Sequence, residues 1–272
     1  MNNNLSIQKC KPFLRWAGGK TWLVRKIDDF LPDSFDIYHE PFVGGGSMFF
    51  YLEPEASLIS DLNEELILTY QVLRDEPDKL VKKLLSYENT KDFYYNMRAK
   101  KMRSDLGKAA RFLYLNRTSF NGIYRVNLKG EYNVPYGYLK RYNIDVENLY
   151  LASDLLQNTD IKCQDFEKSL EDVQREDFVF LDPPYTVTHN NNGFIKYNAK
   201  LFDEDSQIRL SNYMDSLNEI GAKYIITNAA HDWVYDEFKR KNNQIFVLDR
   251  ASLIGGKNAK RGYYEEYLIT NI

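Results

Sequence analysis

Cysteine and long apolar runs are scarce in this chain, and each scarcity excludes a class of protein. The 272 residues include only two cysteines, Cys10 and Cys163. Two cysteines provide neither a disulfide framework nor a metal cluster, so we expect a reducing, cytoplasmic location and no bound metal. No apolar run reaches the roughly 18 residues that span a bilayer. The first residues also lack the apolar core of a signal peptide. We therefore expect a soluble protein without a membrane segment.

Apolar and aromatic residues are plentiful. Hydrophobic residues make up 43% of the chain and aromatic residues 15%, which is enough for one large core or two modest ones. This composition excludes a disordered or collagen-like chain, and no internal repeat is visible.

Charge is distributed unevenly along the chain. The formal net charge of −3 argues weakly against a protein that binds nucleic acid. Residues 97–142, however, contain eleven Lys and Arg residues against only Asp105 and Glu131. A basic segment on an acidic body favours a polyanionic partner. A solvated, Lys-rich helix face is the alternative.

Strand-like and helix-like segments alternate near the N-terminus. The expected elements are a helix at 20–31, a strand at 37–42, a helix start at 47–52 and a strand at 57–60. The order of strand, Gly-rich turn, helix, strand and acid is typical of half a Rossmann-like unit.

The middle of the chain has a different pattern. Residues 64–116 have helical apolar spacing, and residues 124–134 predict a hairpin. Further strands are expected at 161–163, 178–181, 223–227, 244–248 and 265–270. The simplest architecture is one open α/β sheet, formed by residues 1–63 and 151–272, with a helical and hairpin insertion at 64–150 that packs on it.

The sharpest motif is Asp182-Pro183-Pro184-Tyr185, which directly follows the apolar strand 178–181. Open α/β sheets bind ligands at this edge. The Asp182 carboxylate is a strong acceptor for an amino group, and Pro184 keeps Pro183 extended, so that the Pro183 carbonyl points outward. The Tyr185 ring is a flat surface for stacking on a base. The motif favours recognition of an amino group on a planar ring over a merely rigid turn.

Two glycine-containing motifs indicate a cofactor pocket. In the first, Glu40-Pro41-Phe42-Val43 precedes the glycines 44–46, and Asp61 ends the next strand, where an acid bonds the ribose of an adenosine-type ligand. The second, Trp16-Ala17-Gly18-Gly19-Lys20-Thr21, lacks the first glycine of a phosphate-binding loop, since Leu14 stands there. It is consistent with a pocket wall or with a helix N-terminus beside a buried Trp.

The fourth motif, residues 117–125, contains Arg117, Phe120, Asn121 and Arg125 and leads into the predicted hairpin. A β-ribbon fits the major groove of DNA, where Arg reads guanine, and Phe120 could wedge between base steps. A structural hairpin with Phe120 in the core is the alternative.

Together the four motifs resemble the Dam-type DNA adenine-N6 methyltransferases of the α group, and the resemblance covers nearly the whole chain. It implies the fold of the methyltransferases that use S-adenosylmethionine, with a catalytic domain at 1–63 and 151–272 and a target-recognition domain at 64–150. It also implies methylation of adenine in duplex DNA, within GATC, by base flipping and direct in-line transfer that leaves S-adenosylhomocysteine. A bacterial or phage source follows, and a cognate restriction endonuclease is a further expected partner.

The resemblance also assigns residues to three roles. Catalysis is assigned to Asp182, Pro183, Pro184 and Tyr185. Cofactor binding is assigned to Trp16, Gly19, Lys20, Glu40, Phe42, Gly44, Gly46, Asp61, Asp165, Phe166 and Asp182. DNA binding is assigned to Arg15, Arg98, Arg117, Phe120, Asn121, Ile123, Arg125 and Pro135.

Two loops complete the expected site. The polar stretch 186–200 resembles a lid that closes Phe194 and Tyr197 over the target base, and residues 255–262 form a second basic loop. Two other functions compete with this interpretation: a methyltransferase that acts on RNA or on protein amides, and a DNA-binding module without catalysis.

Overall fold

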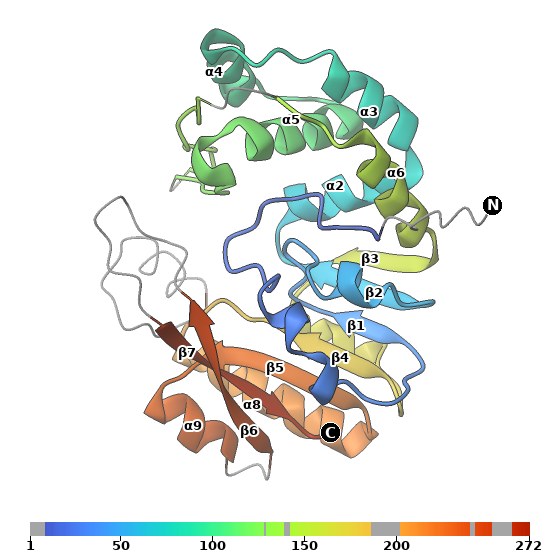
Figure 1. Ribbon diagram of the computed structural model, residues 1–272, viewed down its shortest axis with the longest axis vertical. Helices are drawn as coiled ribbons and strands as arrows, with labels where there is room; N and C mark the ends of the chain where they lie inside the picture. Colours follow the sequence, from blue (N-terminus) through green and yellow to red (C-terminus); the bar gives the residue numbers. More distant parts are fainter. Residues whose placement is uncertain (1–8, 128, 139–141, 186–201, 240–242, 252–262) are drawn as a thin grey trace, which may run out of the picture. The chain divides into compact units, whose positions relative to one another are not determined.

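The chain forms two compact units. The computed structural model describes residues 9–127, 129–138, 142–185, 202–239, 243–251 and 263–272 (Figure 1). Unit 1 comprises Met1–Thr21, Gly44–Glu53 and Asn63–Cys163, and unit 2 comprises Trp22–Val43, Pro54–Leu62 and Gln164–Ile272. The expected insertion at 64–150 falls within unit 1, but this unit has wider bounds. The expected lid at 186–200 and the basic loop at 255–262 lie outside the described residues.

Seven strands of the described residues form a mixed sheet with the order β3-β2-β1-β4-β5-β7-β6. The strands are β1 (Tyr38–Glu40), β2 (Ser57–Asp61), β3 (Thr159–Cys163), β4 (Phe178–Leu181), β5 (Lys223–Ala229), β6 (Gln244–Ala251) and β7 (Tyr263–Thr270). β1 pairs in parallel with β2 and with β4, and β4 pairs in parallel with β5. β7 is antiparallel to β5 and to β6. The predicted α/β fold and its strands are confirmed.

The strand order reverses between β1 and β4. From β1 the chain continues to β2 on one side, whereas β4 lies on the other side and is followed by β5. Open α/β sheets bind ligands beyond the carboxyl ends of the strands at such a reversal. The topology of unit 2 therefore predicts a ligand site at the carboxyl ends of β1 and β4.

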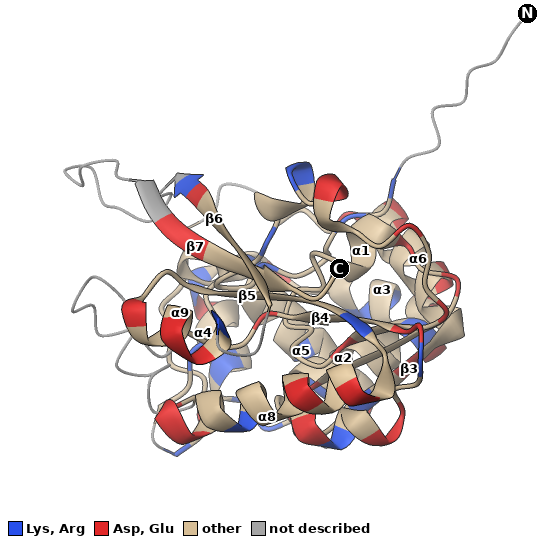
Figure 2. Ribbon diagram, turned by 90° about the horizontal axis from the view of Figure 1, so that it is seen from below, with Lys and Arg blue, Asp and Glu red and all other residues tan. Residues whose placement is uncertain are grey.

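One face of the sheet in unit 2 is covered by α8 (Glu204–Ile220) and α9 (Asp232–Lys239) (Figure 1). Val179 and Leu181 of β4 pair with Tyr224 and Ile226 of β5, so these four side chains share a face. They are buried in one apolar cluster with residues of both helices. Figure 2 marks charged residues along α8 and acidic residues along α9, as expected for helices that are partly solvated.

The segment before β1 differs from its prediction. In place of one helix at 20–31, the chain forms two 3-10 turns, η1 (Leu23–Arg25) and η2 (Asp28–Phe30). Lys26 Nζ donates to the carbonyl of Asp249 at 3.2 Å, and the Phe30 ring lies 4.8 Å from that of Phe246. These contacts with β6 override the helical spacing of the local sequence.

Unit 1 is mainly helical, as predicted for its central part. Its helices are α1 (Phe49–Leu52), α2 (Glu64–Asp75), α3 (Pro77–Leu85), α4 (Lys91–Ala99), α5 (Asp105–Thr118) and α6 (Val146–Leu155). Side-chain oxygens of Asn63, Thr90, Ser104 and Asp145 cap α2, α4, α5 and α6, which satisfies backbone N–H groups that have no partner within the helix. Most of α5 is buried, so it is the central helix of the unit. No helix in the described parts of the chain is long and apolar enough to cross a membrane.

A buried carboxylate, Asp177, organises the amino end of β4. It is 1% exposed. Its oxygens accept hydrogen bonds from the backbone N–H groups of Ile37 and Gln174, at 3.0 and 2.8 Å, and bond the ring of His39 at 2.9 Å. One side chain therefore joins the chain before β1 to the turn before β4.

We predict that Asp177→Ala lowers the free energy of unfolding by about 3 kcal/mol or more, because each buried donor left without an acceptor costs about 1–3 kcal/mol. Urea denaturation measures this change. Replacement of the exposed Glu171 by Ala is the control and should shift stability by less than about 0.5 kcal/mol. An equal, small effect of both substitutions would contradict the assigned role of Asp177.

Candidate active site

Unit 2 brings three of the predicted acids to one edge of its sheet. Glu40 ends β1, Asp61 ends β2 and Asp182 directly follows β4. β1 pairs with both of the other strands, and paired strands lie about 4.8 Å apart. Three acids separated in sequence therefore stand at the carboxyl ends of adjacent strands, at the reversal of strand order.

The two acids of β1 and β2 differ in burial. Glu40 is 2% exposed, and its Oε2 accepts a hydrogen bond of 2.8 Å from the Tyr38 hydroxyl. Burial and the neighbouring Glu40 carboxylate raise the pKa of Tyr38 well above 10, so this hydroxyl stays a donor. Asp61 is half-buried, and its carbonyl accepts from the N–H of Gln164 at 3.3 Å. Asp61 is thus the more accessible acid.

Residues 182–185 are tied to the strands beside them. Thr227 Oγ1 of β5 donates to Asp182 Oδ1 at 2.8 Å, and the Tyr185 hydroxyl donates to Glu266 Oε2 of β7 at 2.7 Å. Pro183 is buried, whereas Asp182, Pro184 and Tyr185 are half-buried. Burial, together with the Glu266 and Asp182 charges, raises the pKa of Tyr185 well above 10. Tyr185 is therefore a neutral phenol and unsuited to act as a base.

The predicted residues after β3 form a packed corner of unit 2. Asp165 caps η5 (Phe166–Glu171), and Arg209 of α8 donates to Asp165 Oδ1 at 2.5 Å. The Phe166 ring is 3% exposed and lies 5.2 Å from Phe42 and 6.1 Å from Phe202. Phe42 is half-buried. Asp165 and Phe42 are thus accessible, while Phe166 supports them from the core.

The glycine turn at 44–46 belongs to unit 1 and is crowded by aromatic side chains. A Cβ atom at Gly44 would lie 2.7 Å from the Trp16 ring, and one at Gly46 would lie 2.8 Å from the Tyr70 hydroxyl. Both glycines have positive φ, a conformation that disfavours other residues. The glycines are therefore required by the packing of unit 1 itself.

The Trp16-to-Thr21 motif does not open a helix, so the alternative of a helix N-terminus is wrong. Trp16 is half-buried and stacks on Tyr124 with ring centroids 5.4 Å apart. Lys20 is 3% exposed, and its Nζ donates to the Gly18 carbonyl at 3.2 Å. The N–H of Gly19 donates to the Trp16 carbonyl at 3.3 Å. A compact loop holds this Lys and this Trp.

The predicted hairpin is confirmed as a short ribbon in unit 1. Antiparallel bridges join Val126 to Tyr132 and Ser119 to Tyr136. Five of the expected DNA-binding residues are exposed, namely Arg15, Phe120, Asn121, Arg125 and Pro135. Phe120 is 53% exposed, so the alternative that places it in the core is wrong. Ile123 is half-buried.

A buried side chain that the sequence reasoning missed, Asn116, connects the exposed segment at Arg15 with the exposed turn at Phe120 and Asn121. Its Oδ1 accepts from the N–H of Arg15 at 2.9 Å. Its Nδ2 donates to the carbonyls of Arg15 and Gly122, at 2.7 and 3.1 Å. Asn116 therefore fixes the loop that carries Arg15 beside the turn that follows Phe120.

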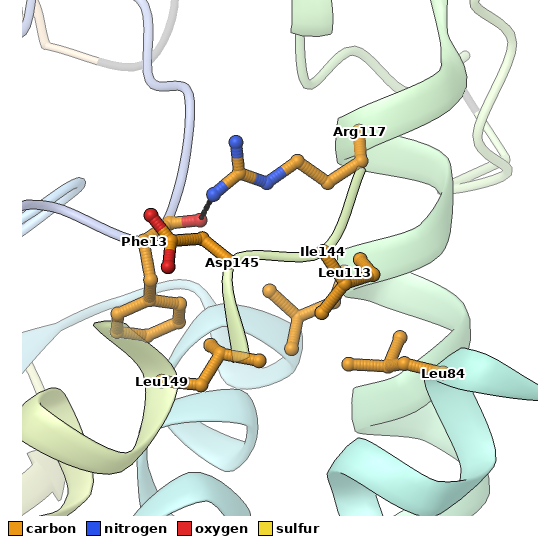
Figure 3. A pocket seen from close by; sticks show the side chains of 7 residues that line it. All are labelled: Phe13, Leu84, Leu113, Arg117, Ile144, Asp145 and Leu149. Carbon is orange, nitrogen blue, oxygen red and sulfur yellow. Dashed lines mark hydrogen bonds between the residues drawn. The ribbon is translucent and has the colours of Figure 1, made fainter. Parts of the chain in front are cut away.

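Two of the arginines expected to bind DNA support the fold of unit 1. Arg98 donates to the Val134 carbonyl at 3.0 Å, and Arg117 donates to the Phe13 carbonyl at 2.7 Å. Figure 3 shows Arg117 and Asp145 at a small cavity lined mostly by apolar side chains. Burial, followed by the nearby Arg15 charge, lowers the pKa of Arg117. Both arginines are half-buried, which leaves part of each side chain exposed.

Four further residues of unit 2 had no signal in the sequence motifs: Thr227, Glu266, Arg250 and Arg209. Thr227, Glu266 and Arg209 each lie far along the chain from the motif residue they contact, and Arg250 contacts Glu266. The period of two in β5 and β7 could have placed Thr227 and Glu266 on one face of the sheet, but not beside Asp182 and Tyr185.

The strand order, the acids at its reversal and the motif after β4 define an α/β fold consistent with the methyltransferases that use S-adenosylmethionine. Residues 16–250 match the family described as D12 class N6 adenine-specific DNA methyltransferase. The chain belongs to this family, and its activity is therefore adenine-N6 methylation of DNA. A methyltransferase of RNA or protein amides and a module without catalysis are set aside.

Similar proteins have matching lengths. Type II methyltransferase M.MjaIII of Methanocaldococcus jannaschii is 40% identical over 96% of this chain and 99% of its own length. Type II methyltransferase M1.LlaDCHI of Lactococcus lactis is 35% identical over 96% and 95%, respectively. DNA adenine methylase of Escherichia coli K12 is 32% identical, again over 96% and 95%. The resemblance to Dam-type enzymes is thereby confirmed.

Replacement of Gly46 tests the packing of the glycine turn. Gly46→Ala places a Cβ at φ +67° and 2.8 Å from the Tyr70 hydroxyl, so we expect a loss of about 2–4 kcal/mol from strain and overpacking together. The matched control is Gly130→Ala, since Gly130 has φ +75° and open space around it. It should lose only about 1–2 kcal/mol. Equal losses in urea denaturation would contradict the crowding at Gly46.

Proposed function

We propose that this enzyme transfers the methyl group of S-adenosylmethionine to N6 of adenine within GATC in duplex DNA, after the adenine has left the helix. S-adenosylhomocysteine is the second product. The observation that carries the proposal is the position of Asp182, directly after β4 at the reversal of strand order and held by Thr227. Open α/β sheets bind ligands at this point.

The acids of unit 2 fit S-adenosylmethionine, which carries a sulfonium, an ammonium group and a ribose diol. Asp61, half-buried at the end of β2, is suited to accept from the two ribose hydroxyls. Glu40 and Asp182 add negative charge at the adjacent strand ends, which favours a cationic ligand. Asp165, Phe42 and Phe166 form a second polar and aromatic group, suited to the adenine ring. A role in cofactor binding is also proposed for Trp16, Gly19, Lys20, Gly44 and Gly46 of unit 1, on the resemblance to the family.

When bound, S-adenosylmethionine supplies an electrophilic methyl group. The residues of the chain must make adenine N6 a better nucleophile, because its lone pair is delocalised into the ring. The Asp182 carboxylate and the Pro183 carbonyl accept hydrogen bonds from its two N–H groups and favour a pyramidal nitrogen. The amino proton becomes acidic after methylation and leaves to water. Catalysis rests on positioning and electrostatics.

An adenine paired within a duplex cannot reach a pocket at the edge of a sheet, so the base must turn out of the helix. Stacking on the half-buried Tyr185 ring replaces part of the stacking that the base loses. Tyr185 is a neutral phenol that donates to Glu266. Its proposed role is therefore to stack its ring on the target adenine.

Exposed residues of unit 1 are suited to read the site. Arg15 and Arg125 are suited to donate to O6 and N7 of the two guanines, and Phe120 to wedge between base steps. Asn121, Ile123 and Pro135 complete the contacts to the bases, and the exposed parts of Arg98 and Arg117 bind phosphates. The name DNA adenine methylase of the Escherichia coli relative is consistent with a Dam-type site. The names of the type II relatives favour a cognate restriction endonuclease as a further partner.

Transfer of labelled methyl groups to two duplexes tests the proposed function. One duplex contains GATC, and the other has the same bases scrambled. We expect N6-methyladenine only in the first duplex, since base-specific donors discriminate one base pair from another by about 1–3 kcal/mol. Equal label in both duplexes would keep the reaction and refute the GATC assignment. Label in neither would refute the proposed substrate site.

The same duplexes test Arg125. Arg125→Ala should reduce discrimination at one guanine by about 1–3 kcal/mol. Arg103 is an exposed arginine of the same unit, so Arg103→Ala is the matched control, and its effect should be uniform across sequences. Unchanged discrimination by Arg125→Ala would assign recognition to other residues.

Removal of the Asp182 carboxylate tests the catalytic assignment. We expect Asp182→Ala to reduce the rate of methyl transfer to below about 1%, as when a preorganised hydrogen-bonding group is lost from an active site. Its free energy of unfolding should fall by about 1–3 kcal/mol, because the buried Thr227 hydroxyl loses an acceptor. Asp160, exposed on β3, provides the control Asp160→Ala, which should keep full activity. Full activity of Asp182→Ala would refute its role.

A further inference from the structure

A line of polar side chains crosses the sheet of unit 2 behind the Asp182-to-Tyr185 motif. Its members are Asp182 after β4, Thr227 of β5, Glu266 of β7 and Arg250 of β6.

The register of the strands explains why these side chains lie on one face of the sheet. Leu181 pairs with Ile226, so Asp182 and Thr227 follow on the same face. Glu266 pairs with Ala229 on one side and with Leu248 on the other, and residues two apart in a strand share a face. The line lies on the face opposite α8 and α9.

Glu266 is the centre of this line. It is 4% exposed, and its two carboxylate oxygens have different partners. Oε1 accepts from Arg250 Nη1 at 2.7 Å, and Oε2 accepts from the Tyr185 hydroxyl at 2.7 Å. A buried carboxylate is stable only when it is paired and hydrogen-bonded. The positive charge of Arg250 thus stabilises the buried Glu266 carboxylate, which accepts the hydrogen bond from Tyr185.

The contact restricts the Tyr185 ring at both ends. The backbone of Tyr185 follows two prolines, Pro183 and Pro184, which limit the turn to few conformations. The far end of the ring is fixed by the hydroxyl bond to Glu266. A side chain with two rotatable bonds, held at its backbone and its tip, presents its ring face in one orientation.

We propose that Glu266, itself held by Arg250, is a positioning residue for methyl transfer, because it sets the orientation in which the Tyr185 ring receives the target adenine. The inference rests on the proposed function, in which Tyr185 stacks on that base. Glu266 touches neither the base nor the cofactor in this role and acts through the phenol. A merely structural Glu266 would stabilise the sheet and leave the reaction of the folded enzyme unchanged.

Four variants separate these roles. Glu266→Met keeps the volume and removes both acceptors, and Tyr185→Phe removes the hydroxyl and keeps the ring. The double variant combines them, and Tyr185→Ala removes the ring. Glu237 is another buried glutamate of unit 2, 8% exposed and bonded to the Ser211 hydroxyl at 2.7 Å. Glu237→Met is therefore the matched control for the loss of a buried carboxylate.

The readouts are kcat, KM for each substrate, and the fluorescence of a duplex with 2-aminopurine in place of the target adenine. Misplacement of a reacting group by about 1 Å costs up to about a hundredfold in rate. We expect Glu266→Met and Tyr185→Phe each to lower kcat about tenfold or more, with KM changed less than about twofold. The double variant should be no slower than the slower single variant, since each single substitution already removes the hydrogen bond between Tyr185 and Glu266. Both single variants should leave 2-aminopurine brighter than the unsubstituted enzyme does, because the base stacks less well.

Two results would overturn the inference: an unchanged kcat in Glu266→Met, or losses that multiply in the double variant. Tyr185→Phe keeps the buried ion pair, so it decides the question if Glu266→Met fails to fold. Tyr185→Ala distinguishes the failure of the proposed function. Unchanged activity of Tyr185→Ala would refute stacking on Tyr185 and the inference with it. A slow Tyr185→Ala beside fully active Tyr185→Phe and Glu266→Met would keep the stacking and refute the positioning.

Discussion

The parallel pairing of β1 with β2 on one side and β4 on the other is the constraint on which the candidate site of unit 2 depends. It places Glu40, Asp61 and Asp182 at three adjacent strand ends, although 120 residues separate the last two. The pairing is itself stabilised by burial, because β4 is buried along its whole length and one face of the sheet packs on α8 and α9. The packing of apolar side chains in the core thus fixes the positions of the three acids at the strand ends.

The polar groups of the site are positioned by neighbours that carry no motif. Thr227 bonds Asp182, Glu266 bonds Tyr185, and Arg209 bonds Asp165. Such partners orient the groups beside them, because a half-buried carboxylate or phenol with one fixed bond has few remaining orientations. In unit 1, Asn116 does the same for two backbone segments. The reactive groups and their supports therefore come from different parts of the chain.

The activity of this chain follows from its family, whereas the surroundings of each predicted residue follow from its fold. The family match and the relatives establish adenine-N6 methylation of DNA. The structure adds the environment of each predicted residue, and some environments differ from the expected role. Arg98 and Arg117 bond backbone carbonyls within unit 1, and Phe166 is a core residue. Gly44 and Gly46 are required by Trp16 and Tyr70, so their presence alone is no measure of ligand contact.

The sequence by itself determined the strands, the helical middle of the chain and the Asp182-to-Tyr185 motif. These features are local, because period-two burial, capping residues and prolines act over a few residues. It failed at residues 20–31, where contacts with β6 replaced a helix with two 3-10 turns. Only the tertiary structure decided that Phe120 is exposed, that Asn116 joins the segments of Arg15 and Gly122, and that Arg250, Glu266 and Tyr185 form one line. The physical reason is that each depends on strand register or on packing between residues distant in sequence, and no local pattern encodes such a contact.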